Sequence, residues 1–250
     1  MLHPHPHRIA WLAAVAAVLL APGDARAYTL KHTADGQLVR WNAPEIVLCV
    51  ARSVPGHGPR RADVRRAAVM AAETWSEVPG APTVRVLEHP CELGVLDGVN
   101  TIGVAREWTH GARLAVTQSH YTADGRLLEA DVMINGSLTF AMIQEREEAD
   151  GFDLPSVLTH ELGHVLGLDE SAAPAAVMWP TTRPGETHQR ELAPDDVDAV
   201  LALYGGEAAA TGAFASYGCA AAPRPLPMSW AWPLAVVAIS FARRRRRPAR

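Results

Sequence analysis

The part of this 250-residue sequence between Tyr28 and Gly205 has little positive charge. It holds 14 lysine and arginine residues against 25 aspartate and glutamate residues, a net charge of −11, whereas the whole chain stands at −4. A surface with this balance repels polyanions, so nucleic-acid binding is excluded as the expected function of this part. The sequence also lacks internal repeats, and its length suits one domain with short additions.

The N-terminal apolar run is too short to be a membrane span. The run "IAWLAAVAAVLLA" (9–21) has 13 residues, whereas crossing a bilayer takes about 20. Arg8 precedes this run, and "ARA" at 25–27 follows it as a small-x-small cleavage site. We therefore predict a signal peptide at 1–27, a mature chain that begins at Tyr28, and export from the cell.

The C-terminal end carries a second targeting pattern. A linker at 206–224 contains Cys219, and a mostly apolar run then leads into five consecutive arginines at 243–247. Arginines directly after an apolar run are typical of a stop-transfer signal. The order Gly-Cys, apolar segment and arginine cluster resembles the sorting tails of myxobacterial surface proteins. This resemblance implies a sorting or anchor tail at 225–250 and a processing or lipidation site at Cys219. It also implies a location at the cell surface, at the outer membrane or outside the cell, with the tail contacting the membrane before or instead of processing.

Cysteine is scarce, since the chain has only three. With Cys219 assigned to the tail, Cys49 and Cys91 remain in the folded part. Two cysteines in an exported protein predict one disulfide. The bond would close a loop of about forty residues, which is worth ~3–4 kcal/mol of stability in the chain-entropy model. Two buried free thiols are the alternative.

Hydrophobic periodicity predicts an α+β fold. We expect strands at 45–51, 83–87, 100–105, 112–118 and 127–135, and helices at 61–78, 153–167 and 193–206. Asp153 suits the start of the second helix and Gly167 suits its end. The third helix carries an apolar stripe of Val197, Val200, Leu201 and Tyr204. Strands that precede most of the helices favour an α+β domain with a mixed sheet and three main helices.

The stretch "HELGHVLGLDES" (160–171) carries the strongest chemical signal. His160 and His164 are four residues apart, so a helix places both imidazoles on one face, where they can bind one ion. Glu161 lies beside them and can act as general base on a water molecule whose pKa zinc lowers towards ~7. An amphipathic helix with solvated polar residues is the alternative. The apolar neighbours of the histidines and the continuation of the motif weigh against it.

The residues beyond this helix resemble the metzincin zinc metalloproteases, and most of all their matrixin branch. The family pattern HExxHxxGxxH is matched at His160, Glu161, His164 and Gly167, and Met178 in "VMWP" matches the Met-turn that follows. The segment "LAPDDVDAVLALYG" (192–205) resembles the last helix of the family. The resemblance covers roughly 40–205 and implies a metzincin, zincin-like catalytic domain at 28–205, with a mixed twisted sheet.

The resemblance also implies a function. It predicts a secreted or surface-anchored zinc endopeptidase, a monomer with one catalytic Zn²⁺, which hydrolyses peptide bonds by Glu161-assisted attack of zinc-bound water. An extended peptide substrate would pair with an edge strand near 112–118, and the S1′ wall would follow the Met-turn at 181–184. A catalytically weak or inactive domain that binds peptides or surface components is the alternative. A zinc hydrolase of non-peptide amides is another.

The sequence departs from the family pattern at the third ligand, where Glu170 replaces a histidine. A carboxylate is an acceptable zinc ligand beside two histidines. We therefore predict a ligand set of His160, His164 and Glu170. Asp169 in place of Glu170, or no third side chain at all, are the alternatives. A carboxylate ligand makes the ion less electrophilic, so we expect the activity to be reduced.

Two further family features are missing from the sequence. No PRCG-like latency motif occurs, and no histidine-rich loop for a second zinc site is recognisable. The remaining candidates are scattered and are expected to be surface or loop residues: His89, His110, His120 and His188. The acidic run at 145–150 offers oxygen ligands for Ca²⁺, but a solvated loop explains it as well, so calcium is not supported.

Overall fold

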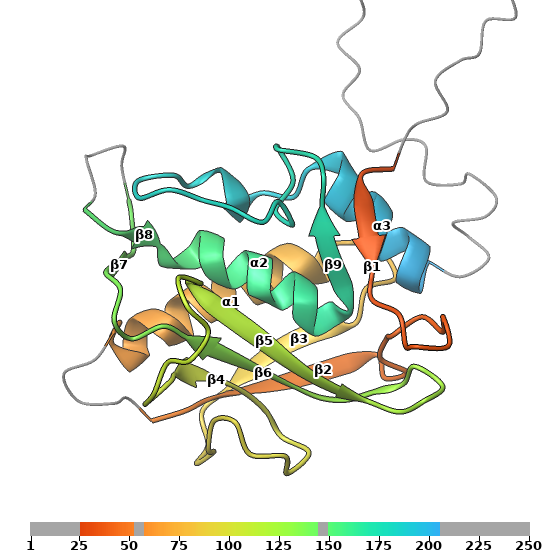
Figure 1. Cartoon of the computed structure of the whole chain (residues 1–250), viewed down its shortest axis with the longest axis horizontal. Helices are drawn as coiled ribbons and strands as arrows, with labels where there is room; N and C mark the ends of the chain where they lie inside the picture. The colour runs from red at the N-terminus through yellow and green to blue at the C-terminus, as the bar shows by residue number, and fades with distance from the viewer. Residues whose placement is uncertain (1–25, 53–57, 145–149, 206–250) are drawn as a thin grey trace, which may run out of the picture. The chain divides into compact units, whose positions relative to one another are not determined.

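The computed structural model describes residues 26–52, 58–144 and 150–205 (Figure 1). The predicted signal peptide up to residue 25, the linker at 206–224 with Cys219 and the tail at 225–250 lie outside the described residues. Within the described ranges, no helix is both long and apolar enough to cross a membrane.

The described chain alternates short strands with three main helices. The strands are β1 (Tyr28–Leu30), β2 (Glu45–Val50), β3 (Thr83–Leu87), β4 (Asn100–Val104), β5 (Ala115–Tyr121), β6 (Leu127–Ile134), β7 (Phe140–Ala141), β8 (Phe152–Asp153) and β9 (Leu168–Ser171). The helices are α1 (Arg61–Ser76), α2 (Leu154–Leu166), α3 (Pro194–Tyr204) and the short 3-10 helix η1 (His188–Arg190). The predicted α+β class with a mixed sheet is confirmed.

The main sheet has five strands in the order β3-β2-β4-β6-β5. The strands β3, β2, β4 and β6 run parallel to their neighbours, and β5 pairs antiparallel with β6. Because β5 is the last strand in this order, one of its edges has no strand partner among the described residues. That free edge is the place where an extended peptide can add a strand.

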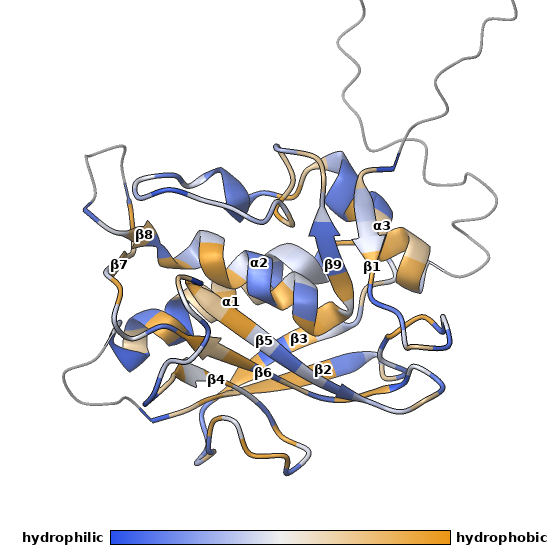
Figure 2. Cartoon of the chain, in the orientation of Figure 1, coloured by the Kyte–Doolittle hydropathy of each residue, from blue (hydrophilic) through white to orange (hydrophobic). Residues whose placement is uncertain are grey.

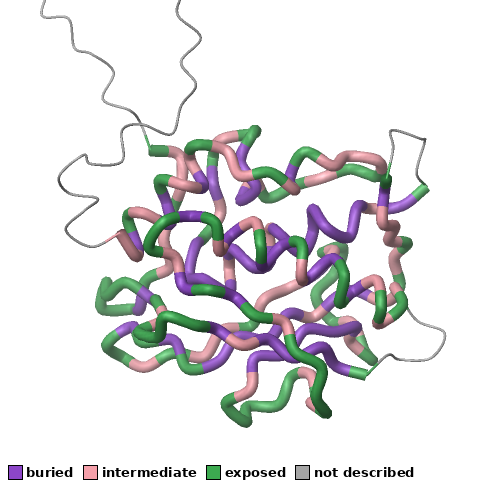
Figure 3. The backbone as a smooth tube through the Cα atoms, turned by 180° about the vertical axis from the view of Figure 1, so that it is seen from behind, coloured by how far each residue is buried: buried purple, intermediate pink, exposed green. Residues whose placement is uncertain are grey.

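Both long helices pack against the same face of the sheet, where the hydrophobic core lies (Figure 1). Alternate residues of β2 point into this core, namely Ile46, Leu48 and Val50, as the two-residue period of a strand requires. The indole nitrogen of Trp75 in α1 donates to the carbonyl oxygen of Thr159 in α2 at 2.7 Å, so a buried hydrogen bond joins the two helices. Figure 3 shows the buried segments at the centre of the molecule and the exposed ones mainly in its connecting loops.

One sequence prediction about the position of an element was wrong. The edge strand spans Ala115–Tyr121, not 112–118, because the turn at 122–125 fixes the register: Ala115 pairs with Ile134 at the far end of the hairpin. In α3, the predicted apolar residues Val197, Val200, Leu201 and Tyr204 all pack against the core, and Asp196, Ala199 and Leu203 are buried beside them. A buried aspartate cannot be anticipated from hydrophobic periodicity.

The two cysteines of the folded part are bonded to each other. Cys49 lies in β2, and Cys91 lies in the connection between β3 and β4, with their Cα atoms 6.4 Å apart. The backbone nitrogens of Gly94, Asp97 and Gly98 in the same connection donate to buried carboxylates of β6. The disulfide and these hydrogen bonds tie a long surface connection to the sheet.

Candidate metal centre

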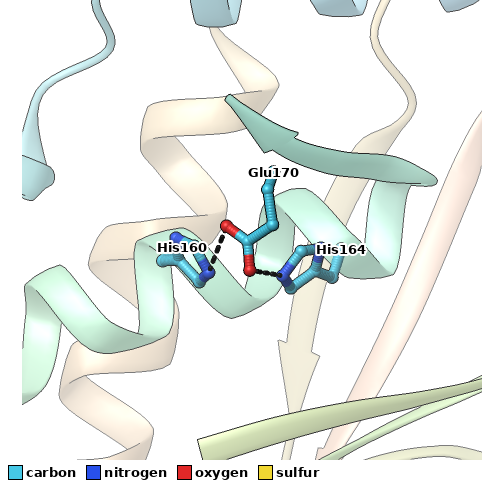
Figure 4. Close-up of side chains that lie close together, drawn as sticks. All are labelled: His160, His164 and Glu170. Atoms are coloured by element: carbon cyan, nitrogen blue, oxygen red, sulfur yellow. Dashed lines mark ion pairs between the residues drawn. The ribbon is translucent and has the colours of Figure 1, made fainter. Parts of the chain in front are cut away.

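Helix α2 presents His160 and His164 on one face, one turn apart (Figure 4). The Nδ1 atom of His160 lies 2.8 Å from the carbonyl oxygen of Val177, and Nδ1 of His164 lies 3.0 Å from that of Leu168. A carbonyl oxygen only accepts, so each Nδ1 carries the hydrogen and each Nε2 keeps its lone pair free. Metal-binding histidines require this tautomer, in which a backbone carbonyl oxygen holds the Nδ1 hydrogen and so orients the ring.

Gly167 ends α2 and turns the chain back over it. Its φ of 99° lies in the left-handed region, which a side chain disfavours. An added Cβ would also lie 2.3 Å from the carbonyl oxygen of Val39. The chain then enters β9, which pairs antiparallel with β1 and so holds Glu170 above the helix.

The carboxylate of Glu170 lies between the two imidazoles, as the dashed lines in Figure 4 show. Its Oε2 is 3.8 Å from Nε2 of His160, and its Oε1 is 3.8 Å from Nε2 of His164. One ligand atom from each of the three residues lies within 4.8 Å of the others. Two imidazoles and one carboxylate are a ligand set that zinc accepts, so these three residues would hold the ion.

These three side chains present only hydrogen-bond acceptors to one another, so a cation between them would satisfy all three. Both Nε2 atoms are acceptors in the tautomer described above, and a carboxylate is also an acceptor. Consistently, Oε2 of Glu170 is buried and has no hydrogen-bond partner among the described residues. Burial, together with the neighbouring His160, lowers the pKa of His164 to about 3, so its imidazole is neutral near pH 7. A neutral imidazole is the form that binds zinc.

Asp169, the alternative third ligand, lies outside this cluster. It is exposed, and its Oδ1 accepts a hydrogen bond from the backbone nitrogen of Glu170 at 2.9 Å. Adjacent residues of a strand point to opposite faces, so β9 presents only one of these two carboxylates to the histidines.

Glu161 faces the same space as the three candidate ligands but does not belong to their cluster. It is 5% exposed, and its Oε2 accepts a hydrogen bond from Oγ1 of Thr117 in β5 at 2.6 Å. Burial raises the pKa of the Glu161 carboxyl above its ordinary value, against the opposing effects of His160 and of the Thr117 hydroxyl. A carboxylate held next to a reaction centre with a raised pKa is suited to accept and return a proton.

Met178 is buried in a turn that packs tightly against α2. An added Cβ on Gly163 of α2 would lie 2.2 Å from Sδ of Met178 and 2.9 Å from Cζ2 of Trp75, so a larger residue would displace these side chains. The turn is held by Asp196 of α3, whose carboxylate accepts hydrogen bonds from the backbone nitrogens of Val177 at 2.8 Å and Met178 at 3.1 Å. Neither Gly163 nor Asp196 was predicted as part of this site, although the sequence shows a glycine inside the helix and "PDD" at the start of α3.

A cavity of about 870 Å³ opens onto this site. One side is formed by the start of β5 and the residues before it, and another by the segment after the Met178 turn. Its lining includes Thr181 and Thr182, which fall in the predicted S1′ wall, and His110, which was expected to be a surface or loop residue. Most of the acidic run at 145–150 lies outside the described residues.

The sequence is similar to those of several known metalloproteinases. Over 53 residues, 21% of this chain, the sequence is 55% identical to Metalloendoproteinase 1-MMP of Arabidopsis thaliana, and this covers 14% of that protein. Over 168 residues, 66% of this chain, it is 26% identical to Matrix metalloproteinase-20 of Homo sapiens, covering 32% of that protein. It is also 48% identical to Metalloendoproteinase 1 of Glycine max over 54 residues, 22% of this chain and 17% of the relative.

The chain thus spans at most about a third of the length of these relatives. The sequence model of the matrixin family (peptidase M10) matches residues 59–205, which is more than half of this chain. That range includes α1, the sheet from β3 to β6, the histidine helix α2, the Met178 turn and α3. The chain described here belongs to the matrixin family.

Proposed function

We propose that this protein is a zinc-dependent endopeptidase whose ion is held by two histidines and one glutamate. One observation carries the proposal: His160, His164 and Glu170 converge beside the buried carboxylate of Glu161, at a cavity next to a free strand edge. Membership of the matrixin family supports it. Zinc bound by the three side chains would supply Lewis-acid activation of a water molecule and of the substrate carbonyl group.

The chain's own residues supply binding and proton transfer. The free edge of β5 offers main-chain N–H and C=O groups to an extended peptide. Glu161 accepts a proton from the attacking water at its carboxylate and returns it to the nitrogen of the leaving amine. The hydrogen bond from Thr117 holds one oxygen of Glu161, which leaves the other oxygen for this transfer.

The negative charge of Glu170 distinguishes this site from one built of three neutral imidazoles. A carboxylate ligand partly neutralises the ion, so it polarises a carbonyl less strongly. We therefore expect slower turnover than a three-histidine variant of the same chain would show.

We also propose that the protein is exported and that its C-terminal segment attaches it to a membrane or the cell surface. The bond between Cys49 and Cys91 supports export, because disulfides persist in oxidising compartments. Mass spectrometry of the chain recovered from its source cells tests this. A chain that begins at Tyr28 is expected, and an uncleaved N-terminus would contradict the proposal.

The activity is tested by measuring zinc content and casein hydrolysis on the same purified preparation. We expect about one zinc per chain and hydrolysis that a chelator abolishes. Glu161→Gln keeps the shape of the side chain but removes the base, so it should retain zinc and lose at least ~10²-fold in kcat. Full zinc occupancy with no chelator-sensitive cleavage would instead favour a peptide-binding domain.

The role of Glu170 is tested by a matched pair of neighbouring substitutions. Glu170→Ala should weaken zinc binding strongly, whereas Asp169→Ala should change it little, because only Glu170 faces the histidines. Glu170→His should restore binding and raise kcat. Equal zinc affinity in the two alanine variants would remove Glu170 from the ligand set.

A further inference from the structure

Lys31 is the only lysine in the 250-residue sequence, and it lines the cavity of the candidate metal centre. It follows β1 directly, and its backbone nitrogen donates to the carbonyl oxygen of Gly167, just before β9. Its Nζ donates a hydrogen bond to Oγ of Ser119 in β5 at 3.2 Å. A single ammonium group is therefore fixed beside the edge strand on which the substrate is proposed to lie.

This ammonium has no full counter-charge among the described residues. No carboxylate lies within 4.0 Å of Nζ in that part of the chain, and its one hydrogen-bond partner there is a neutral hydroxyl. Burial lowers the pKa of Lys31, and the more distant Asp169 and Glu161 raise it. A partly buried cation of this kind retains N–H donors that are available to an incoming anion.

The geometry of β5 indicates which part of a substrate meets Lys31. The Oγ1 atom of Thr117 contacts Glu161, and Oγ of Ser119 contacts Lys31, so these alternate residues point to the same face of the strand. A strand added to β5 places its own alternate side chains on that face, about 6.8 Å apart. The substrate residue paired with Ser119 therefore directs its side chain towards Lys31.

The end of β5 near Lys31 is also polar. Figure 2 shows the strand changing from hydrophobic at its start to hydrophilic towards its end, where Gln118, Ser119 and His120 lie. An apolar substrate side chain gains little there, since it would desolvate the ammonium without pairing it. An acidic side chain can form a charge-assisted hydrogen bond with the same group.

We propose that Lys31 makes this enzyme select substrates with an acidic side chain at the position that pairs with Ser119. This position lies two residues from the one that pairs with Thr117, and the inference rests on the proposed peptidase function. Lys31 acts as a specificity residue that contacts the substrate side chain and takes no part in the proton transfer. The substrate class is thus an extended peptide with a glutamate or aspartate at this subsite.

The first test compares fluorogenic peptides that differ only by Glu, Gln or Lys at one position, scanned on both sides of the scissile bond. For the wild-type protein we expect kcat/KM to favour Glu over Gln about tenfold at one position two or three residues from that bond. The preference should fall as NaCl is raised, because salt screens partly exposed charges. Lys31→Met should abolish it, and Lys31→Glu should reverse it in favour of the lysine peptide.

Arg85→Met is the matched control, because it removes one positive charge from β3, at the opposite edge of the sheet from β5. This variant should keep the wild-type preference for Glu. A wild-type protein that cleaves all three peptides equally would overturn the proposal. A preference that survives in Lys31→Met would overturn it as well, because another cation would then be responsible.

A binding measurement separates failure of this inference from failure of the peptidase function. Reductive methylation with ¹³C-formaldehyde labels Lys31 as the only side-chain amine, beside the chain's N-terminal amine, and keeps its charge. In the Glu161→Gln variant, the Glu peptide should shift the dimethyl-lysine NMR signal and the Gln peptide should not. If the wild-type protein cleaves nothing, the peptidase function fails and this signal still decides the role of Lys31. Identical responses to both peptides would refute that role.

Discussion

Asp196 is expected to stabilise the Met178 turn next to the candidate metal centre. The substitution Asp196→Asn measures its contribution to the free energy of unfolding and to zinc affinity. Its side chain is 1% exposed. Its Oδ2 accepts hydrogen bonds from the backbone nitrogens of Val177 and Ala193, both at 2.8 Å. Its Oδ1 accepts one from the backbone nitrogen of Met178 at 3.1 Å. One carboxylate thus joins the Met178 turn to the first turn of α3.

The expected loss of stability follows from these three hydrogen bonds. Asparagine has the same size, but its amide group replaces one acceptor oxygen with a donor. At best the amide oxygen keeps the two donors of Val177 and Ala193, and the nitrogen of Met178 is left unpaired in the interior. An unpaired buried N–H costs ~1–3 kcal/mol, and the two retained bonds lose their charge assistance.

Removal of a buried charge offsets part of this loss. Burial raises the pKa of Asp196 in spite of the three N–H donors, which shows that desolvation of the carboxylate is itself unfavourable. We therefore expect Asp196→Asn to lower the free energy of unfolding by about 2–4 kcal/mol. The exposed Asp198 lies on the same helix, and Asp198→Asn is the control for helix charge.

The substitution should also lower the zinc affinity of the candidate metal centre. The carbonyl oxygen of Val177 accepts the hydrogen of Nδ1 of His160, so Asp196 fixes the residue that orients a candidate ligand. Loss of such outer support lowers metal affinity by roughly 10–100-fold. A weaker zinc affinity in Asp196→Asn, with normal affinity in Asp198→Asn, is therefore expected.

Urea denaturation of metal-free protein and competition with a chromophoric chelator provide the two measurements. Metal-free protein is needed for the first, because bound zinc adds its own linkage to the apparent stability. An unfolding free energy for Asp196→Asn within ~0.5 kcal/mol of the wild-type value would refute the reasoning, since that is the range of ordinary surface substitutions.

Three further predictions concern stability. Gly163→Ala should destabilise the fold by ~1–3 kcal/mol or more through overpacking against Sδ of Met178, measured as a drop in the urea midpoint. Replacing both Cys49 and Cys91 by serine should cost ~3–4 kcal/mol relative to the oxidised wild type, and equal melting temperatures under oxidising conditions would contradict this. Burial raises the pKa of Asp131 to about 6, so ionisation of this group is harder in the folded state. Its contribution to stability should fall as pH rises from about 4 to about 6, and Asp131→Asn should lack this dependence in urea titrations at several pH values.

Local sequence was sufficient for the elements whose signals are local. The helix of the two histidines was predicted to within a residue at each end, because Asp153 caps its start and Gly167 adopts the left-handed conformation at its end. The edge strand was placed three residues early, since its limits depend on hydrogen bonds to β6 rather than on its own residues. The apolar stripe of α3 was predicted, but the burial of Asp196 was not, because its hydrogen-bond partners lie in the Met178 turn, in another part of the chain.

What the sequence by itself determined is the chemistry available: two imidazoles one helical turn apart, a carboxylate beside them and a glycine that reverses the chain. These depend on spacing along a helix, and helix geometry is the same in every fold. Only the tertiary structure decided which carboxylate of β9 faces the histidines and which hydroxyl holds Glu161. It alone placed the single lysine beside the edge strand. Each of these contacts joins residues that are brought together by strand pairing, and no periodicity in the sequence encodes that pairing.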